Sequence, residues 1–119
     1  MTGSLVDLSN GRDVAANVAR ASGPLGRTFG LLGRASLSDG EGMWFDESAS
    51  VHTFGMRTSI DVVFVSADGT VVAMFERLPP WRLAAARGAR DVVELAPGTC
   101  ERAAVRIGMK IGMVWRSST

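Results

Sequence analysis

Residues 51–78 read VHTFGMRTSIDVVFVSADGTVVAMFERL and contain the strongest structural signal in the chain. Two apolar runs, 60–65 and 71–75, flank a short loop that contains Asp68 and Gly69. β-Branched runs on both sides of an Asp-Gly loop are typical of a β-hairpin. The sequence therefore predicts two adjacent antiparallel strands, over 60–65 and 71–76.

The two faces of the first predicted strand are both apolar. Side chains alternate between the faces of a strand, so the even and the odd positions of 60–65 point in opposite directions. Asp61 is the one polar residue among them. Strands that are apolar on both faces are normally covered on both sides. We therefore expect this hairpin to be central in the fold.

Composition is that of a small soluble globular protein. The chain has 119 residues, 46% of them hydrophobic, and this length predicts a single domain over 1–119. Fourteen glycines and four prolines indicate many turns. Thirteen cations against twelve anions give a net charge of +1, a balance that argues against a nucleic-acid ligand.

Cysteine content and the N-terminus indicate the cellular compartment. Cys100 is the single cysteine, which excludes an internal disulfide and a cysteine-rich zinc site. The first residues lack a basic segment followed by an apolar run, so we expect no secretory signal. No apolar run approaches the roughly 20 residues of a membrane span. These features predict a cytoplasmic protein with no membrane span, no metal and no cofactor.

The remaining segments add further short strands. Asn10-Gly11 between 5–8 and 14–21 predicts a hairpin with both central residues at positive φ, although the Ala-rich second arm could instead form a short helix. Leu25, Phe29 and Leu32 recur at helical spacing, which predicts a helix through Arg34. Further strands are predicted over 43–45, 91–95 and 107–116.

Two segments have helical character. Residues 82–90 are predicted to form one helical turn or a loop, and Thr99 is predicted to cap a short helix over 100–105. Six or more short strands with one or two short helices indicate a mainly β fold, either a β-sandwich or a small barrel.

Several motifs, in this order and spacing, resemble those of the bacterial and archaeal family known as domain of unknown function 192, particularly its signal-less actinobacterial type. They are GLLGR at 30–34, GM at 42–43, HTFGMR at 52–57, IDVVF at 60–64, VEL at 93–95, PG at 97–98 and Gly108. The resemblance covers about residues 5–114 and implies a compact β-sandwich with short helices. It implies no activity; some members lie near pilus-assembly or secretion genes, which implies an accessory link to such systems.

The chain departs from the pattern of this family at two places. Exported relatives often carry a cysteine pair after the proline that follows the hairpin, whereas Pro80 here precedes Trp81 and Arg82. Met109 occupies the position where the family usually has an aspartate.

His52, Arg57 and Asp61 form the main polar cluster near the hairpin. A carboxylate on an apolar face requires a partner. We therefore expect Asp61 to be structural, accepting backbone N–H groups or a bidentate pair with Arg57. Ligand binding by this cluster is the second interpretation, and acid–base catalysis the third.

Other residues also have two interpretations. Trp44, Trp81 and Trp115 either belong to the core, which we favour, or line a pocket. Cys100 is expected to be a buried core residue, with a reactive thiol as the alternative. Arg82, Arg87 and Arg90 form either a solvated loop, which we favour, or an anion-binding patch.

These observations predict a binding or accessory module with a polar site at the edge of the central hairpin. The predicted contacts, to a small anion or a peptide, are His52, Phe54, Arg57 and Trp44. The alternative is a small enzyme that uses His52 and Asp61 as acid–base groups.

Overall fold

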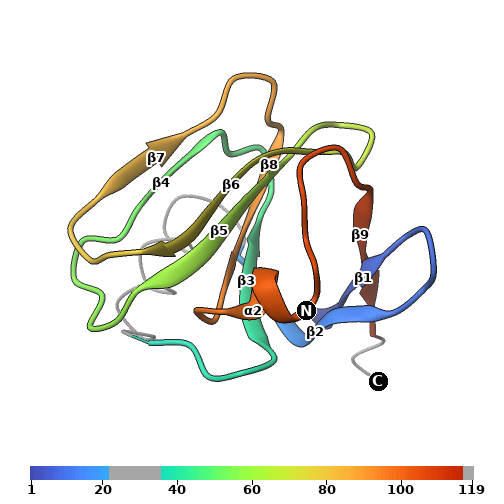
Figure 1. The fold of residues 1–119 in the computed structure, drawn as a ribbon, viewed down its shortest axis with the longest axis horizontal. Coiled ribbons are helices and arrows are strands. Elements are labelled where there is room, and N and C mark those ends of the chain that lie inside the picture. The colour runs from blue at the N-terminus through green and yellow to red at the C-terminus, as the bar shows by residue number, and fades with distance from the viewer. Residues whose placement is uncertain (22–35, 117–119) are drawn as a thin grey trace.

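The structure is a computed structural model in which residues 1–21 and 36–116 are described. These residues form nine strands and one short helix (Figure 1). The elements are β1 (Thr2–Asp7), β2 (Asp13–Ala21), β3 (Glu41–Phe45), β4 (Ser50–His52), β5 (Ile60–Val65), β6 (Val71–Leu78), β7 (Leu83–Ala85), β8 (Asp91–Leu95), α2 (Thr99–Arg102) and β9 (Ile111–Trp115). The mainly β fold expected from the sequence is confirmed. The predicted helix through Arg34 lies outside the described residues.

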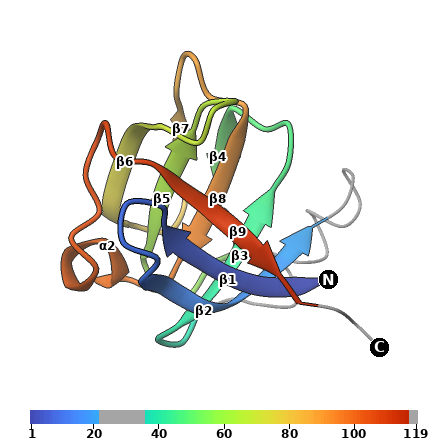
Figure 2. The ribbon, with the colours of Figure 1, turned by 90° about the vertical axis from the view of Figure 1, so that its right-hand side faces the viewer.

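Seven strands form one curled sheet in the order β6-β5-β8-β3-β2-β1-β9, and β4 and β7 form a separate small sheet. Within the large sheet β2 and β3 are parallel and the other neighbours are antiparallel. Figure 2 shows β9, β1 and β2 crossing one side of the molecule, with β5 and β6 behind them. The result is a half-barrel whose buried apolar residues form two clusters.

The two end strands of the large sheet approach each other at one place. The turn between β5 and β6 contacts the segment that precedes β9, through a bridge between Thr70 and Lys110 and through hydrogen bonds such as Ile111 N to Gly69 O, 2.9 Å. In Figure 1 this orange-red segment rises to meet the turn. The contact closes the half-barrel at one end.

The predicted central hairpin is confirmed for its first strand. β5 pairs with β6 and β8, and all six of its residues are buried. Ile60, Val62 and Phe64 belong to one apolar cluster, while Val63 and Val65 belong to a second. Strand β6, however, is an edge strand with exposed residues along its second half, so the expectation that both strands are central is wrong for β6.

Other segments agree with the sequence in part. The hairpin of β1 and β2 forms, but Gly11 takes a positive φ and Asn10 does not, because the loop is longer than two residues. Residues 82–90 contain strand β7 rather than a helical turn. Gly98, not Thr99, is the N-cap of α2, and the Thr99 hydroxyl donates to Ala96 O at 2.7 Å instead.

Candidate functional site

Asp61 is a buried structural acid in the middle of the fold. Its side chain is 0% exposed and lies on β5. One carboxylate oxygen accepts the backbone N–H of Arg77 at 2.8 Å, and the other accepts that of Cys100 at 2.9 Å. Charge-assisted bonds of this kind compensate for the burial of the carboxylate. Asp61 thereby ties β5 to the end of β6 and to helix α2.

The ion pair between Arg57 and Asp61 that the sequence allowed is not formed. Arg57 is exposed on the segment between β4 and β5, and no ion pair joins it to Asp61 in the described ranges. Backbone N–H groups satisfy Asp61 without the cost of ordering and desolvating a guanidinium. This leaves Arg57 available to solvent.

Cys100 is buried beside Asp61, as expected for a core residue. Burial raises the pKa of its thiol well above the ordinary value of 9.0, and the neighbouring Asp61 carboxylate raises that pKa further. Because the thiolate is the nucleophilic form, we expect Cys100 to react slowly in the folded protein.

Thr53 joins the segment after β4 to the segment before β7. Its buried hydroxyl donates to Pro79 O at 2.7 Å and accepts the N–H of Arg82 at 2.9 Å. Its backbone oxygen accepts the N–H of Trp81 at 3.1 Å, and its N–H donates to Arg82 O at 2.9 Å. The two segments, side by side in Figure 1, are therefore held in one arrangement.

This arrangement brings three rings together on the surface, in a group that we call the aromatic ledge: His52, Phe54 and Trp81. The ring centroids of His52 and Phe54 lie 4.9 Å apart, and those of Phe54 and Trp81 lie 5.7 Å apart in a stacked geometry. Phe54 is 43% exposed and Trp81 66% exposed. Trp81 also has a φ of 65°, which is rare for a residue with a large side chain.

The outer face of the small sheet continues the ledge. His52 and Leu83 are directly opposite each other in the β4–β7 register, so their side chains share a face. Val51 and Ala84 point the other way and are buried in the apolar cluster that contains Phe64. Leu83 is 73% exposed, and the surface next to the ledge is therefore apolar.

His52 presents a hydrogen-bond donor on this surface. Its Nδ1 accepts the backbone N–H of Phe54 at 3.3 Å. An Nδ1 that accepts leaves Nε2 to carry the proton of the neutral ring. That N–H can donate to a carboxylate or another acceptor on a ligand.

The chain around the small sheet is basic. Residues 48–60 and 79–90 contain four arginines and no carboxylate: Arg57, Arg82, Arg87 and Arg90. Arg90 pairs with Asp91 at 3.4 Å. The other three are exposed, and within the described part of the chain they form no ion pair. The two segments that carry the ledge are therefore basic although the net charge of the chain is only +1.

The structure separates the predicted binding residues. His52 and Phe54 lie in the ledge, but Trp44 is buried in the other apolar cluster, where its indole N–H donates to Asp46 at 3.1 Å. Core packing is thus confirmed for Trp44 and wrong for Trp81. Trp115 packs beside the cluster of Trp44, with the guanidinium carbon of Arg20 5.6 Å from its ring centre.

Leu83 is a surface residue that sequence reasoning missed, and Trp81, for which the core was favoured over a pocket, is also exposed. The available signal was Pro79-Pro80 before Trp81, since two prolines end a strand and place the next residue in a connection at the surface.

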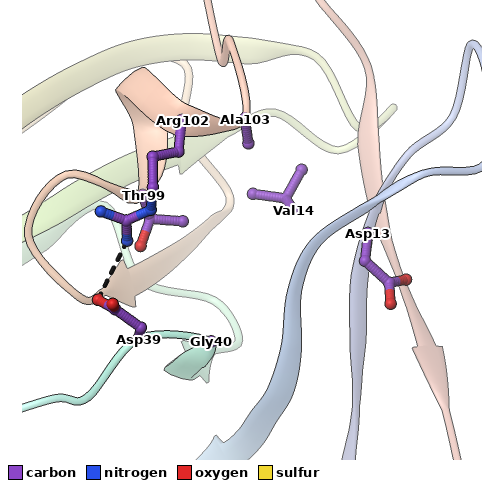
Figure 3. Close-up of a pocket in the computed structure, with 7 residues that line it drawn as sticks. All are labelled: Asp13, Val14, Asp39, Gly40, Thr99, Arg102 and Ala103. Carbon is purple, nitrogen blue, oxygen red and sulfur yellow. Dashed lines mark hydrogen bonds and ion pairs between the residues drawn. The ribbon is translucent and has the colours of Figure 1, made fainter.

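A shallow pocket of about 200 Å³ lies elsewhere, between β2, the segment before β3 and α2 (Figure 3). Its lining residues are Asp13, Val14, Asp39, Gly40, Thr99, Arg102 and Ala103. Arg102 pairs with Asp39 at 3.2 Å, and Thr99 donates to Ala96. Arg102 and Asp39 in this pocket are therefore already paired with each other, so the ledge is the better candidate site.

Residues 1–21 and 36–116 lack both a metal-binding cluster and a membrane-spanning helix. These residues contain no group of three or more His, Cys, Asp or Glu that could hold a metal ion. They also contain no helix that is long and apolar enough to cross a membrane.

Comparison with solved structures found two similar proteins. One is from Sinorhizobium meliloti 1021 and is described as a "putative transcription regulator"; it is 26% identical, with a TM-score of 0.78 over 94% of this chain and 92% of that one. The other, from Novosphingobium aromaticivorans DSM 12444, is a protein of unknown function; it is 25% identical, with a TM-score of 0.74 over 94% of this chain and 84% of that one.

The remaining comparisons concern curated proteins and families. No curated protein matches the chain. The model of the DUF192 family, described as "Uncharacterized ACR, COG1430", matches residues 6–113. Because this match spans nearly the whole chain, the protein belongs to the DUF192 family.

Proposed function

We propose that this protein is a binding module whose site is the aromatic ledge, and that its ligand combines a negative charge with a planar or apolar group. The observation that carries the proposal is the contact of His52 with Phe54 and the stack of Phe54 on Trp81, in which the two larger rings remain exposed. Exposed apolar patches with a polar rim mark interaction sites in many proteins.

Rigidity of the ledge supports this proposal. Thr53 hydrogen-bonds the segment after β4 to the segment before β7, so the backbone that carries the rings does not need to be ordered when a ligand arrives. An aromatic side chain that becomes covered contributes about 1–3 kcal/mol to binding. A left-handed backbone at a tryptophan is also the kind of local strain that proteins retain at functional sites.

Charge supports the anionic character of the ligand. Arg57, Arg82 and Arg87 are exposed on the segments that flank the small sheet. The Nε2–H of His52 adds a hydrogen-bond donor at the ledge itself. Arginine is well suited to carboxylate because its guanidinium donates two parallel hydrogen bonds.

Acid–base catalysis by His52 and Asp61 has less support. Asp61 is fully buried, and both of its carboxylate oxygens accept backbone N–H groups. His52 lies on the other sheet, in contact with Phe54. A general acid or base must come within hydrogen-bond reach of the reacting atom.

The test is an NMR titration of backbone amides with three small probes: phenylacetate, acetate and phenethylamine. Phenylacetate should shift the amides of 52–57 and 81–83 with a Kd on the order of 1 mM, which is normal for a fragment of this size. Acetate lacks the ring and phenethylamine carries the opposite charge, so both should bind several-fold more weakly.

Two variants test whether phenylacetate binds at the ledge. Trp81→Ala should weaken phenylacetate binding about fivefold or more, while Ile107→Ala, which removes an equally exposed apolar side chain (64% against 66%), should leave it unchanged. Equal binding by Trp81→Ala and the unmodified chain, or equal binding of phenylacetate and phenethylamine, would contradict the proposal.

A further inference from the structure

Strand β7 presents an open backbone edge on the small sheet. In an antiparallel pair, residues whose N–H and C=O groups bond to the partner alternate with residues whose groups point away from it. Thr53 N donates to Arg82 O at 2.9 Å, and Ala86 N donates to Ala49 O at 3.0 Å. This register directs the N–H and C=O groups of Leu83 and Ala85 away from β4.

That edge of β7 is uncovered. Leu83 and Ala85 are both exposed, and in the described ranges the small sheet contains β4 and β7 alone. Across those ranges, the outward N–H and C=O groups of Leu83 and Ala85 have no hydrogen-bond partner. Ser50, which lies opposite Ala85 on β4, already has an interaction partner. The edge of β7 is thus open at two consecutive outward positions.

The ledge lies beside the open edge. Leu83 begins β7 and shares its outer face with His52, and Trp81 precedes it by two residues. A strand that paired with β7 would place every second side chain on this outer face, next to the rings. The ledge would then contact the apolar side chains of that strand.

The arginines beside β7 favour an acidic partner strand. Arg82 and Arg87 flank β7 at its two ends, both exposed, and the segments 48–60 and 79–90 contain no carboxylate. An acidic strand would compensate this charge, whereas a basic strand would be repelled.

Hydrogen-bond chemistry favours a peptide over a nucleic acid. The edge offers alternating donors and acceptors, at the N–H and C=O groups of Leu83 and Ala85. A peptide backbone provides a donor and an acceptor at each residue, whereas a phosphodiester oxygen only accepts.

On these grounds we infer that the ligand of this site is an extended acidic peptide with alternating apolar residues, which adds to the outer edge of β7 as a third strand. Strand addition is a known mode of peptide recognition. This inference rests on the proposed function, because the ledge supplies the side-chain contacts.

The first experiment is selection of a displayed library of random heptapeptides on the full chain, followed by measurement of the most enriched peptide. We expect enrichment of sequences that alternate Asp or Glu with apolar or aromatic residues. A library with no enrichment, or one that enriches basic peptides, would overturn the inference; so would tighter binding of oligothymidine than of any selected peptide.

Amide exchange then reports the geometry directly. With the selected peptide bound, the amides of Leu83 and Ala85 should exchange about tenfold more slowly or better, because they become hydrogen-bonded. The amide of Ala84 already faces β4, so its exchange should change least. Unchanged exchange at Leu83 and Ala85 in the peptide-saturated protein would exclude strand addition.

A pair of variants separates this inference from the proposed function. Ala85→Pro removes one outward N–H donor. An edge strand tolerates proline at such an outward-facing position. Ala85→Ser is the control, because serine retains the N–H. Protected exchange at Ala84 checks that the small sheet remains formed. Ala85→Pro should lose peptide affinity about tenfold while phenylacetate binding is retained.

The outcomes differ for the two claims. If Ala85→Pro binds the peptide normally while Trp81→Ala does not, the ledge is correct and strand addition is wrong. If Trp81→Ala binds both phenylacetate and the peptide normally, the proposed function itself is wrong.

Discussion

Asp61 is the residue at which three distant parts of the chain meet, since it lies on β5 and accepts N–H groups from the end of β6 and from α2. Arg77, one of the donors, takes a left-handed backbone with a φ of 50°. A buried carboxylate that accepts two backbone donors explains how this unusual residue geometry is held in place.

Replacing Asp61 tests this role. Asp61→Ala leaves the buried N–H of Cys100 and the partly buried N–H of Arg77 without an acceptor, so it should destabilise the protein by about 2–5 kcal/mol. Arg57→Ala changes an exposed side chain and should alter stability by about 0.5 kcal/mol or less. Urea denaturation of both single variants and of the double variant would measure this, and the effects should be additive. Strong coupling between the two positions would restore the ion pair that the sequence allowed.

Among the elements, helix α2 is short, and its position depends on its contacts with the large sheet. It has four residues, and Thr99 and Cys100 are buried against the sheet. Its N-cap has no side-chain hydrogen bond, since Gly98 serves that position with a φ of 89°. The link from Cys100 N–H to Asp61 therefore positions the helix, and the thiol points into the core.

Cys100 should make the stability of the protein depend on alkaline pH. The folded state raises the thiol pKa, so it holds the proton more tightly than the unfolded state does. This contribution is fully present below the ordinary pKa of 9.0 and is lost as the pH rises above it. The chain has no tyrosine and a single lysine, so few other groups titrate in this range.

Urea midpoints between about pH 8 and pH 10 should therefore fall with rising pH, and Cys100→Ala should reduce that fall. In parallel, a thiol reagent should label the native protein slowly and the unfolded protein rapidly. An equal pH dependence of the two proteins, or rapid native labelling, would contradict the buried position of Cys100.

On the scale of the whole molecule, the half-barrel is closed where the β5–β6 turn meets the segment before β9. Ile111 N donates to Gly69 O, and Val71 N donates to Met109 O at 2.9 Å. Gly69 has a φ of 89°, and a Cβ added there would lie 3.0 Å from Ile111 O. The closure thus requires both the backbone freedom and the small size of glycine at this position.

Gly69→Ala should destabilise the protein more than Gly11→Ala, by about 1 kcal/mol. Both glycines have positive φ, 89° and 73°, so both variants incur backbone strain. Gly11 has open space around its Cβ position, whereas an alanine at 69 also displaces Ile111 O. Thermal or urea denaturation of the two variants would measure the difference. Equal losses would mean that the closure does not contribute to stability.

Local pattern was sufficient for the long elements of the fold. The two hairpins, the two-sided burial of β5 and the core position of Cys100 follow from apolar runs, turn residues and a lone thiol. These local signals do not show whether β6 is central or at an edge. Sheet order depends on which distant strand pairs with the free edge of each hairpin, and here β8 pairs with β5 and not with β6.

The sequence alone therefore determined which of the longer segments are strands, whereas the tertiary structure decided the small sheet, the partners of Asp61 and the candidate site. β4 and β7 have three residues each, too few for a periodic signal, and their paired residues are more than 30 positions apart. The donors to Asp61 are backbone N–H groups 16 and 39 residues away, and every residue except proline has one. The ledge exists because Thr53 holds two such distant segments together.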